Sequence, residues 1–252
     1  IYQYHPLFRE FLLSRVKKSF STESLSVLCT HAAKLLEEAG QTENAVSLLR
    51  DVSDWDGLVR LITKHAPHML AQGRHRPLED WLNSLPIEIL KSNPWLLYWM
   101  GECHLPFNPS HSKALFENAF EKFKDQKDTA GMFLVWPQLV FSIWMESKDF
   151  SLLDRWILVL EDLMNEVKGF PSDALGLRVA SNMLLVIVTR KLWHPKLEAW
   201  AEMALSLAGV CPNIFDRMNA LFRVAFYRIF FGELKKAMVA IDLLRQLSRT
   251  PK

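Results

Sequence analysis

Three amide side chains in this sequence are each followed, three residues later, by a large apolar residue. The pairs are Gln138 with Phe141, Asn182 with Leu185, and Asn219 with Phe222. Residues three apart lie on the same side of a helix. An amide both donates and accepts hydrogen bonds, which suits a peptide backbone or a sugar, and the apolar neighbour suits an apolar group on the same ligand. The pattern indicates binding; the alternative is that amides are simply tolerated where a groove meets water.

Residues that could perform catalysis or hold a metal are not arranged for it. The sequence contains no phosphate-binding glycine motif, no G-x-S-x-G and no H-E-x-x-H. His65 and His68 could share a metal ion, but Pro67 lies between them and no suitably spaced cysteine or carboxylate follows. Glu37-Glu38, like the carboxylates at 54 and 56, is typical of a helix end. We therefore expect no enzyme activity, no catalytic residue, and no metal or cofactor in this chain.

The elements that position the amides are predicted from a repeat. One packing position recurs at intervals of 33 to 44 residues, within the range of stacked repeat arrays. It is occupied by Ala45, Trp81, Ala114, Trp156, Trp200 and Ala237. Four of these six end the same L-x-x-(W/A) sequence, as in Leu153–Trp156 and Leu234–Ala237. The tryptophans at this position are expected to lie in the core, and the array is expected to recognise a partner.

Apolar residues at helical spacing run through nearly every segment, and no segment alternates strictly. The spacing predicts helices over 44–50, 55–69, 77–85, 94–104, 112–124, 129–146, 150–167, 173–191, 195–208, 214–231 and 233–247, with Ser21 as an early N-cap. The predicted fold is all-α, an α-solenoid of antiparallel helix pairs. The first helix of each later pair, such as 214–231, is apolar nearly all round and should be covered on both sides.

The three amides each lie eighteen residues before Trp156, Trp200 or Ala237. Ala225, Gly232, Leu234, Ala237 and Ile241 resemble a tetratricopeptide repeat. The resemblance implies that the amide position and the one three residues later face a concave groove. We therefore expect Gln138, Asn182 and Asn219 to form a ladder of amides, beside an apolar ladder of Phe141, Leu185 and Phe222. Replacing Asn182 and Asn219 with leucine is predicted to abolish the response to an effector with little loss of stability.

The composition excludes several classes of protein. Half of the 252 residues are hydrophobic, so a large core is possible and disorder is not expected. A net charge of +2 gives no support for nucleic-acid binding. Three distant cysteines fit a reducing cytoplasm, and no apolar stretch is long enough to cross a membrane. The start at Ile1, in the middle of what resembles a domain, suggests a fragment of a longer protein.

Two resemblances refine this prediction. Ala225, Gly232, Leu234, Ala237 and Ile241 match the small, turn and packing positions of a tetratricopeptide repeat. The segment 2–15, the sequence HAAKLLEEAG at 31–40 and the sequence WLNSLPIEIL at 81–90 resemble large bacterial STAND-class transcription regulators. The relatives are the maltose-regulon-activator type with a LuxR-like end and those with a bacterial transcriptional activator domain.

This resemblance implies a domain plan and a role. Residues 1–20 would be the tail of a winged-helix segment, and 21–252 a tetratricopeptide-like repeat domain. The chain would be the regulatory sensor region of a cytoplasmic transcription regulator, which binds an effector, a peptide or another domain of its own protein. ATP and DNA would be bound by parts outside these residues, without direct nucleic-acid or membrane contact here. The alternative is a generic scaffold that binds a partner peptide or protein.

Overall fold

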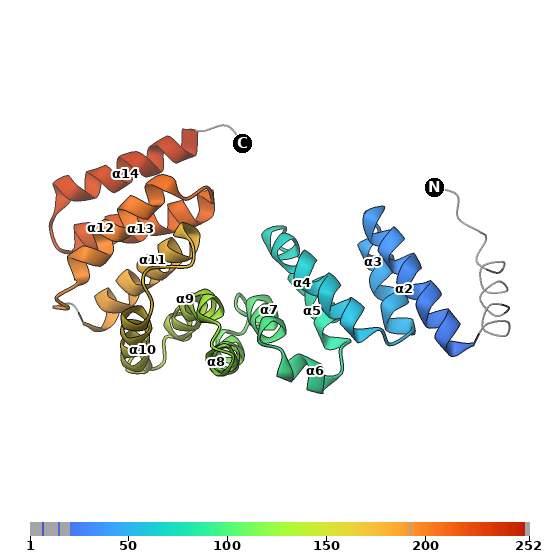
Figure 1. Ribbon diagram of the computed structural model, residues 1–252. Helices are drawn as coiled ribbons and strands as arrows, with labels where there is room; N and C mark the ends of the chain where they lie inside the picture. The colour runs from blue at the N-terminus through green and yellow to red at the C-terminus, as the bar shows by residue number, and fades with distance from the viewer. Residues whose placement is uncertain (1–6, 8–14, 16–20, 192, 250–252) are drawn as a thin grey trace. The chain divides into compact units, whose positions relative to one another are not determined.

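The computed structural model describes residues 7, 15, 21–191 and 193–249, and all the regular structure in this part of the chain is helical (Figure 1). The predicted winged-helix tail at 1–20 lies outside the described residues, apart from Leu7 and Arg15. The helices are α2 (Thr22–Glu38), α3 (Thr42–Asp51), α4 (Trp55–Ala71), α5 (His75–Asn83), α6 (Ile87–Ser92), α7 (Pro94–His104), α8 (Pro109–Asp125), α9 (Thr129–Glu146), α10 (Leu152–Glu166), α11 (Asp173–Arg190), α12 (Leu197–Val210), α13 (Ile214–Phe230) and α14 (Leu234–Arg249). The all-α helical-repeat prediction is confirmed.

Side-chain caps explain where many of the helices begin. Asn93 and Asp128 accept hydrogen bonds from backbone N–H groups in the first turns of α7 and α9, and Ser21 caps α2 in the same way. These bonds satisfy amides that have no partner within the helix. The predicted bounds of α7 and α9 match the structure, whereas α6 was not predicted, because six residues are too few to show a periodic pattern.

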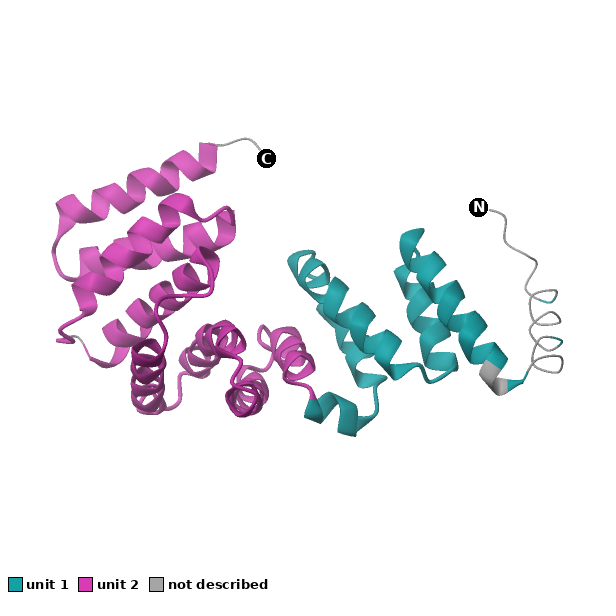
Figure 2. Ribbon diagram, viewed as in Figure 1, with its two compact units in different colours: residues 1–92 teal, residues 93–252 magenta. Residues whose placement is uncertain are grey.

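The chain divides into two compact units, residues 1–92 and 93–252 (Figure 2). In the first unit, consecutive helices from α2 to α5 pack against one another. In the second unit, α8 packs between α7 and α9, and α11 packs against α9, α12 and α13. The division falls inside the region predicted as a repeat domain, between Ser92 and Asn93.

The predicted packing position is buried in most repeats. Trp81, Trp156 and Trp200 lie in the core together with Ala45 and Ala237, as expected. Ala114 is exposed, so its assignment was wrong. The buried residues of α8 are instead Ser112, Phe116, Ala119, Phe120 and Phe123. Because each residue turns a helix by about 100°, Ala114 lies on the opposite side from Ser112.

The first helices of the later pairs are not all covered in the same way. α9 and α11 are buried along most of their length. α13 instead exposes an apolar stripe, and the expectation that both of its sides are covered is wrong for the described part of the chain. The stripe consists of Phe215, Phe222, Phe226, Ile229 and Phe230, each at least half exposed. None of the described helices is both long and apolar enough to cross a membrane.

Candidate ligand-binding pocket in the second unit

The six residues predicted to face a groove lie on three neighbouring helices of the second unit. α9 carries Gln138 and Phe141, α11 carries Asn182 and Leu185, and α13 carries Asn219 and Phe222. α11 packs against both α9 and α13, so the three helices form one contiguous layer. Four of the six side chains line a single pocket, which is the candidate functional site; Gln138 and Asn182 do not.

The pocket has a volume of about 620 Å³, within the range of sites for small ligands. It is lined by Phe141, Trp144, Leu184, Leu185, Val188, Thr189, Asn219, Phe222, Arg223, Phe226 and Phe230. The lining is mainly aromatic and aliphatic; Thr189, Asn219 and Arg223 are its polar residues, and Trp144 carries an indole N–H. An apolar cavity with a few polar groups suits a ligand that is mostly apolar and is oriented by one or two polar contacts.

Helical spacing places these side chains on one face of each helix. On α13, Asn219, Arg223, Phe226 and Phe230 follow one another at intervals of three or four residues and so share a face. On α9, the rings of Phe141 and Trp144 are stacked with their centroids 5.9 Å apart. The aromatic wall of the pocket is therefore fixed by two helices that α11 holds apart.

Arg223 is the pocket residue that sequence reasoning missed. Its guanidinium carbon lies 5.5 Å from the centroid of the Phe141 ring, and its Nη1 lies 3.4 Å from the Ser181 hydroxyl. No carboxylate of the described residues pairs with it. Burial lowers the pKa of Arg223 to about 10, so it stays charged at neutral pH. A charged residue inside an apolar run, four residues after Asn219, was the signal available in the sequence.

Asn182 is buried rather than open to the pocket. Its side chain donates to the Arg178 carbonyl of its own helix at 2.9 Å, and its Oδ1 has no hydrogen-bond partner. Of the three predicted amides, only Asn219 lines the pocket. The ladder of three equivalent amides is therefore corrected to one amide and one arginine on α13.

Replacing Asn182 with leucine is expected to raise the free energy of unfolding by roughly 1 kcal/mol, because a buried unpaired acceptor is removed. Thermal melts of the two proteins measure the change. Asn219→Leu is the matched control, since Asn219 is exposed and its replacement should leave the melting temperature nearly unchanged. A lower melting temperature for Asn182→Leu would contradict this reading of its environment.

A second set of polar residues connects α7, α9, α11 and α13. Glu102 on α7 lies beside Tyr98, Gln138 and Arg178, and Arg178 Nε lies 3.0 Å from Asp216 Oδ2 on α13. We call Tyr98, Glu102, Gln138, Arg178 and Asp216 the polar layer. Burial raises the pKa of Glu102 to about 7, although hydrogen bonds from Gln138 and Tyr98 and the charge of Arg178 oppose the rise. Gln138 therefore contributes to the contacts between α7 and α9 rather than to the pocket.

The raised pKa of Glu102 predicts a pH dependence of stability. Between pH 4.5 and about 7 the folded state binds more protons at Glu102 than the unfolded state, so stability falls as pH rises through this window. Glu102→Gln should remove this loss and stabilise the protein at pH 8, relative to the parent, by about 3 kcal/mol. Urea unfolding at pH 5 and pH 8 measures the effect. Glu121→Gln, at an exposed glutamate, should keep the parent's pH profile, and an unchanged profile in Glu102→Gln would contradict the assignment.

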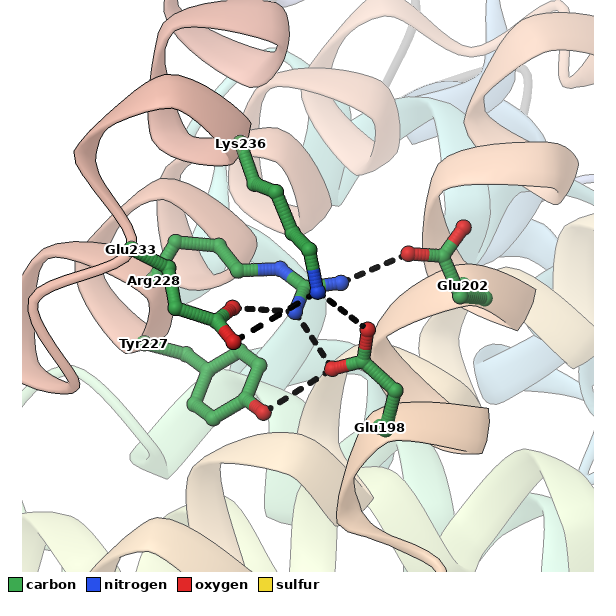
Figure 3. A network of polar contacts seen from close by, with 6 residues as sticks. All are labelled: Glu198, Glu202, Tyr227, Arg228, Glu233 and Lys236. Carbon is green, nitrogen blue, oxygen red and sulfur yellow. Dashed lines mark hydrogen bonds and ion pairs between the residues drawn. The ribbon is translucent and has the colours of Figure 1, made fainter.

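The opposite side of α13 is held by a network around Arg228, whose side chain is only 1% exposed (Figure 3). Arg228 binds Glu198 and Glu202 of α12 and Glu233 next to α14, with 2.6 Å between its Nη2 and Glu202 Oε1. The Tyr227 hydroxyl and the Lys236 ammonium also bind Glu198. We call these six residues the Arg228 cluster. It fixes α12 and α14 against α13.

The histidines weighed as metal ligands have separate neighbours. His65 Nε2 lies 3.5 Å from Glu37, whereas His68 Nε2 lies 2.8 Å from the side chain of Gln72. In the described ranges, no three histidine, cysteine, aspartate or glutamate side chains gather closely enough to hold a metal ion.

The helices and the pocket together define an all-α helical-repeat protein with a ligand-sized apolar cavity. A solved structure that shares this fold is the apo form of the quorum sensor NprR from B. thuringiensis. The two superpose with a TM-score of 0.64 at 15% sequence identity, over 97% of this chain and 70% of the other. No protein-family model matches the sequence, and no curated protein matches it either. The likeness to NprR is one of fold.

Proposed function

We propose that this chain is the effector-binding helical-repeat region of a regulator, and that the effector occupies the pocket of α9, α11 and α13. The pocket is the observation that carries the proposal, because it is largely apolar, of ligand size, and contains an arginine that has no carboxylate partner among the described residues. A ligand that binds one arrangement of these helices better than another shifts the equilibrium between them. The function proposed is therefore recognition and transmission, without catalysis.

The finer assignment rests on the sequence resemblance and on the fold. We propose a cytoplasmic transcription regulator of the STAND class, with its ATPase and DNA-binding parts outside these residues. ATP would be the cofactor of those parts, and no cofactor is proposed for this region. NprR, which has the same fold, is a quorum sensor, which supports a sensory role. A phosphate-binding P-loop encoded upstream of Ile1 in the same reading frame is the observation that tests the class.

The pocket itself is tested by removing its exposed aromatic wall. Phe222 and Phe226 are 63% and 54% exposed, so Phe222→Ser with Phe226→Ser should change the melting temperature little. The same double variant should abolish the rise in melting temperature that apolar peptides and other small ligands cause in the parent protein. The matched control is Phe107→Ser, at a phenylalanine 74% exposed outside the pocket lining. A ligand that stabilises the parent and the double variant equally would contradict the site.

A scaffold that binds a helix or peptide of a partner protein is the second candidate, and the α13 stripe favours it. Phe215 and Ile229 extend this apolar surface along α13 beyond the pocket lining, and Leu234 and Met238 of α14 are also exposed. An amphipathic helix buries such a surface. Phe215→Ser would weaken the binding of such a partner and leave the binding of a small ligand in the pocket unchanged.

A further inference from the structure

The polar groups of the pocket specify more than an apolar ligand. Arg223 and Asn219 are one helical turn apart on α13 and both line the cavity. The side chain of Asn219 makes no hydrogen bond to any described residue, and the Arg223 guanidinium has, among the described residues, only the long contact with Ser181 and the contact with the ring of Phe141. An arginine elsewhere on α13, Arg228, binds three carboxylates. The positive charge in the pocket is therefore left for a ligand to neutralise.

We propose that the pocket binds the C-terminal end of a short apolar peptide, with the terminal carboxylate on Arg223 and the adjoining peptide group on Asn219. This inference rests on the proposed function of the pocket. The guanidinium presents paired N–H donors that match a carboxylate. The Asn219 amide donates and accepts, as a peptide group does. The last apolar side chains of the peptide lie against Phe141, Trp144 and Phe226.

The choice of a peptide end over other carboxylates follows from the lining. A fatty acid offers only its carboxylate as a polar group. Its hydrocarbon chain would cover the Asn219 amide without forming a hydrogen bond to it, which is unfavourable once water is excluded. Its tail also needs a closed apolar channel, whereas Phe222 and Phe226 are more than half exposed. A cavity of about 620 Å³ accommodates the end of a chain and a few side chains, not a long segment that passes through.

Burial strengthens this interaction and adds selectivity. Arg223 is half-buried on the cavity wall, and this burial lowers its pKa to about 10. A carboxylate that reaches it therefore forms a hydrogen-bonded ion pair in a medium less polar than bulk water. A ligand without a negative charge would bury the guanidinium further without compensation. The pocket is thus expected to reject peptides whose C-terminus is amidated.

Fluorescence anisotropy with labelled hexapeptide pools that end in two apolar residues tests this inference. Each pool is prepared with a free C-terminal carboxylate and, separately, with a C-terminal amide. The parent protein should bind the free-acid pool at least about tenfold more tightly than the amide pool. Arg223→Gln should remove this preference, and Arg223→Lys should keep part of it. Arg245→Gln, which makes the same charge change at an exposed arginine of α14, should leave the preference unchanged.

The outcomes separate the inference from the function on which it rests. If the acid and amide pools bind equally and the Phe222→Ser/Phe226→Ser double variant binds neither, the carboxylate contact is overturned and the pocket remains the binding site. Acid-selective binding that survives in the double variant contradicts the proposed function. If dodecanoate binds through Arg223 and neither pool does, the ligand is a fatty acid and the peptide is excluded. Binding of none of these probes also overturns the inference. Melting curves of Arg223→Gln confirm that the tested protein is folded.

Discussion

Replacing Arg228 with methionine is expected to lower the free energy of unfolding by about 3 kcal/mol. Removing one partner of a buried ion pair costs roughly 3–5 kcal/mol. The lower end applies here because Glu198 and Glu202 are about half exposed and regain water when the arginine is lost. Methionine retains the apolar stem, so the change isolates the charge. Urea unfolding followed by circular dichroism at pH 7 gives the free energy.

The same network predicts how this difference varies with pH. Burial opposes ionisation of Glu198, but hydrogen bonds from Arg228, Lys236 and Tyr227 outweigh it and lower its pKa to about 2. The stabilisation is therefore present above pH 4.5 and is lost as the pH falls toward 2. The parent and Arg228→Met should converge in that window. Arg245→Met, at an exposed pair with Asp242, should cost less than about 0.5 kcal/mol at any pH, and a similar cost for both variants would refute the role of Arg228.

Replacing Trp136 with alanine is expected to cost about 3–5 kcal/mol. Trp136 is fully buried in α9, and its indole Nε1 donates to the Trp156 carbonyl of α10 at 2.8 Å. Alanine leaves a cavity in the middle of the second unit and removes the hydrogen bond that ties the two helices. Thermal and urea unfolding measure the loss, and the anisotropy assay should show weaker peptide binding because α9 carries part of the pocket wall.

The matched control for this variant is Trp193→Ala. Trp193 is 90% exposed between α11 and α12, so its removal should change the unfolding free energy by no more than about 0.5 kcal/mol. Trp136→Phe separates packing from hydrogen bonding, since it keeps most of the apolar volume and deletes the donor. If Trp136→Ala unfolds at the same urea concentration as the parent, the burial described for α9 is incorrect.

Most of the helices were predictable from sequence because their signals are local. Asn93 and Asp128 are N-cap residues that mark the starts of α7 and α9, and the spacing of apolar residues indicates how long these helices are. Alignment between repeats was less reliable, because the loops and helices differ in length from one repeat to the next. Counting across them placed Ala114 in the core, although it is exposed, and Asn182 in a groove, although it is buried.

The candidate site was predicted in part for the same reason. Phe141, Leu185, Asn219 and Phe222 do meet in one pocket, because the count between α9, α11 and α13 was close to correct. Arg223 was missed because it lies one residue beyond the apolar ladder position at Phe222, and neither ladder includes its position. The polar layer was not predictable from one sequence, since Glu102 and Arg178 lie on α7 and α11 and nothing local links them.

Both sides of α13 are constrained, so this helix has little freedom to change during evolution. One side carries Asn219 and Arg223 toward the pocket, and five residues beyond Arg223 the same helix supplies the centre of the Arg228 cluster. A mutation that shifts or bends α13 therefore affects both ligand binding in the pocket and the stability that the Arg228 cluster provides. Phe141, Trp144 and Val188 lie on α9 and α11, outside the Arg228 cluster, so divergence in ligand preference among related proteins should accumulate at those positions first.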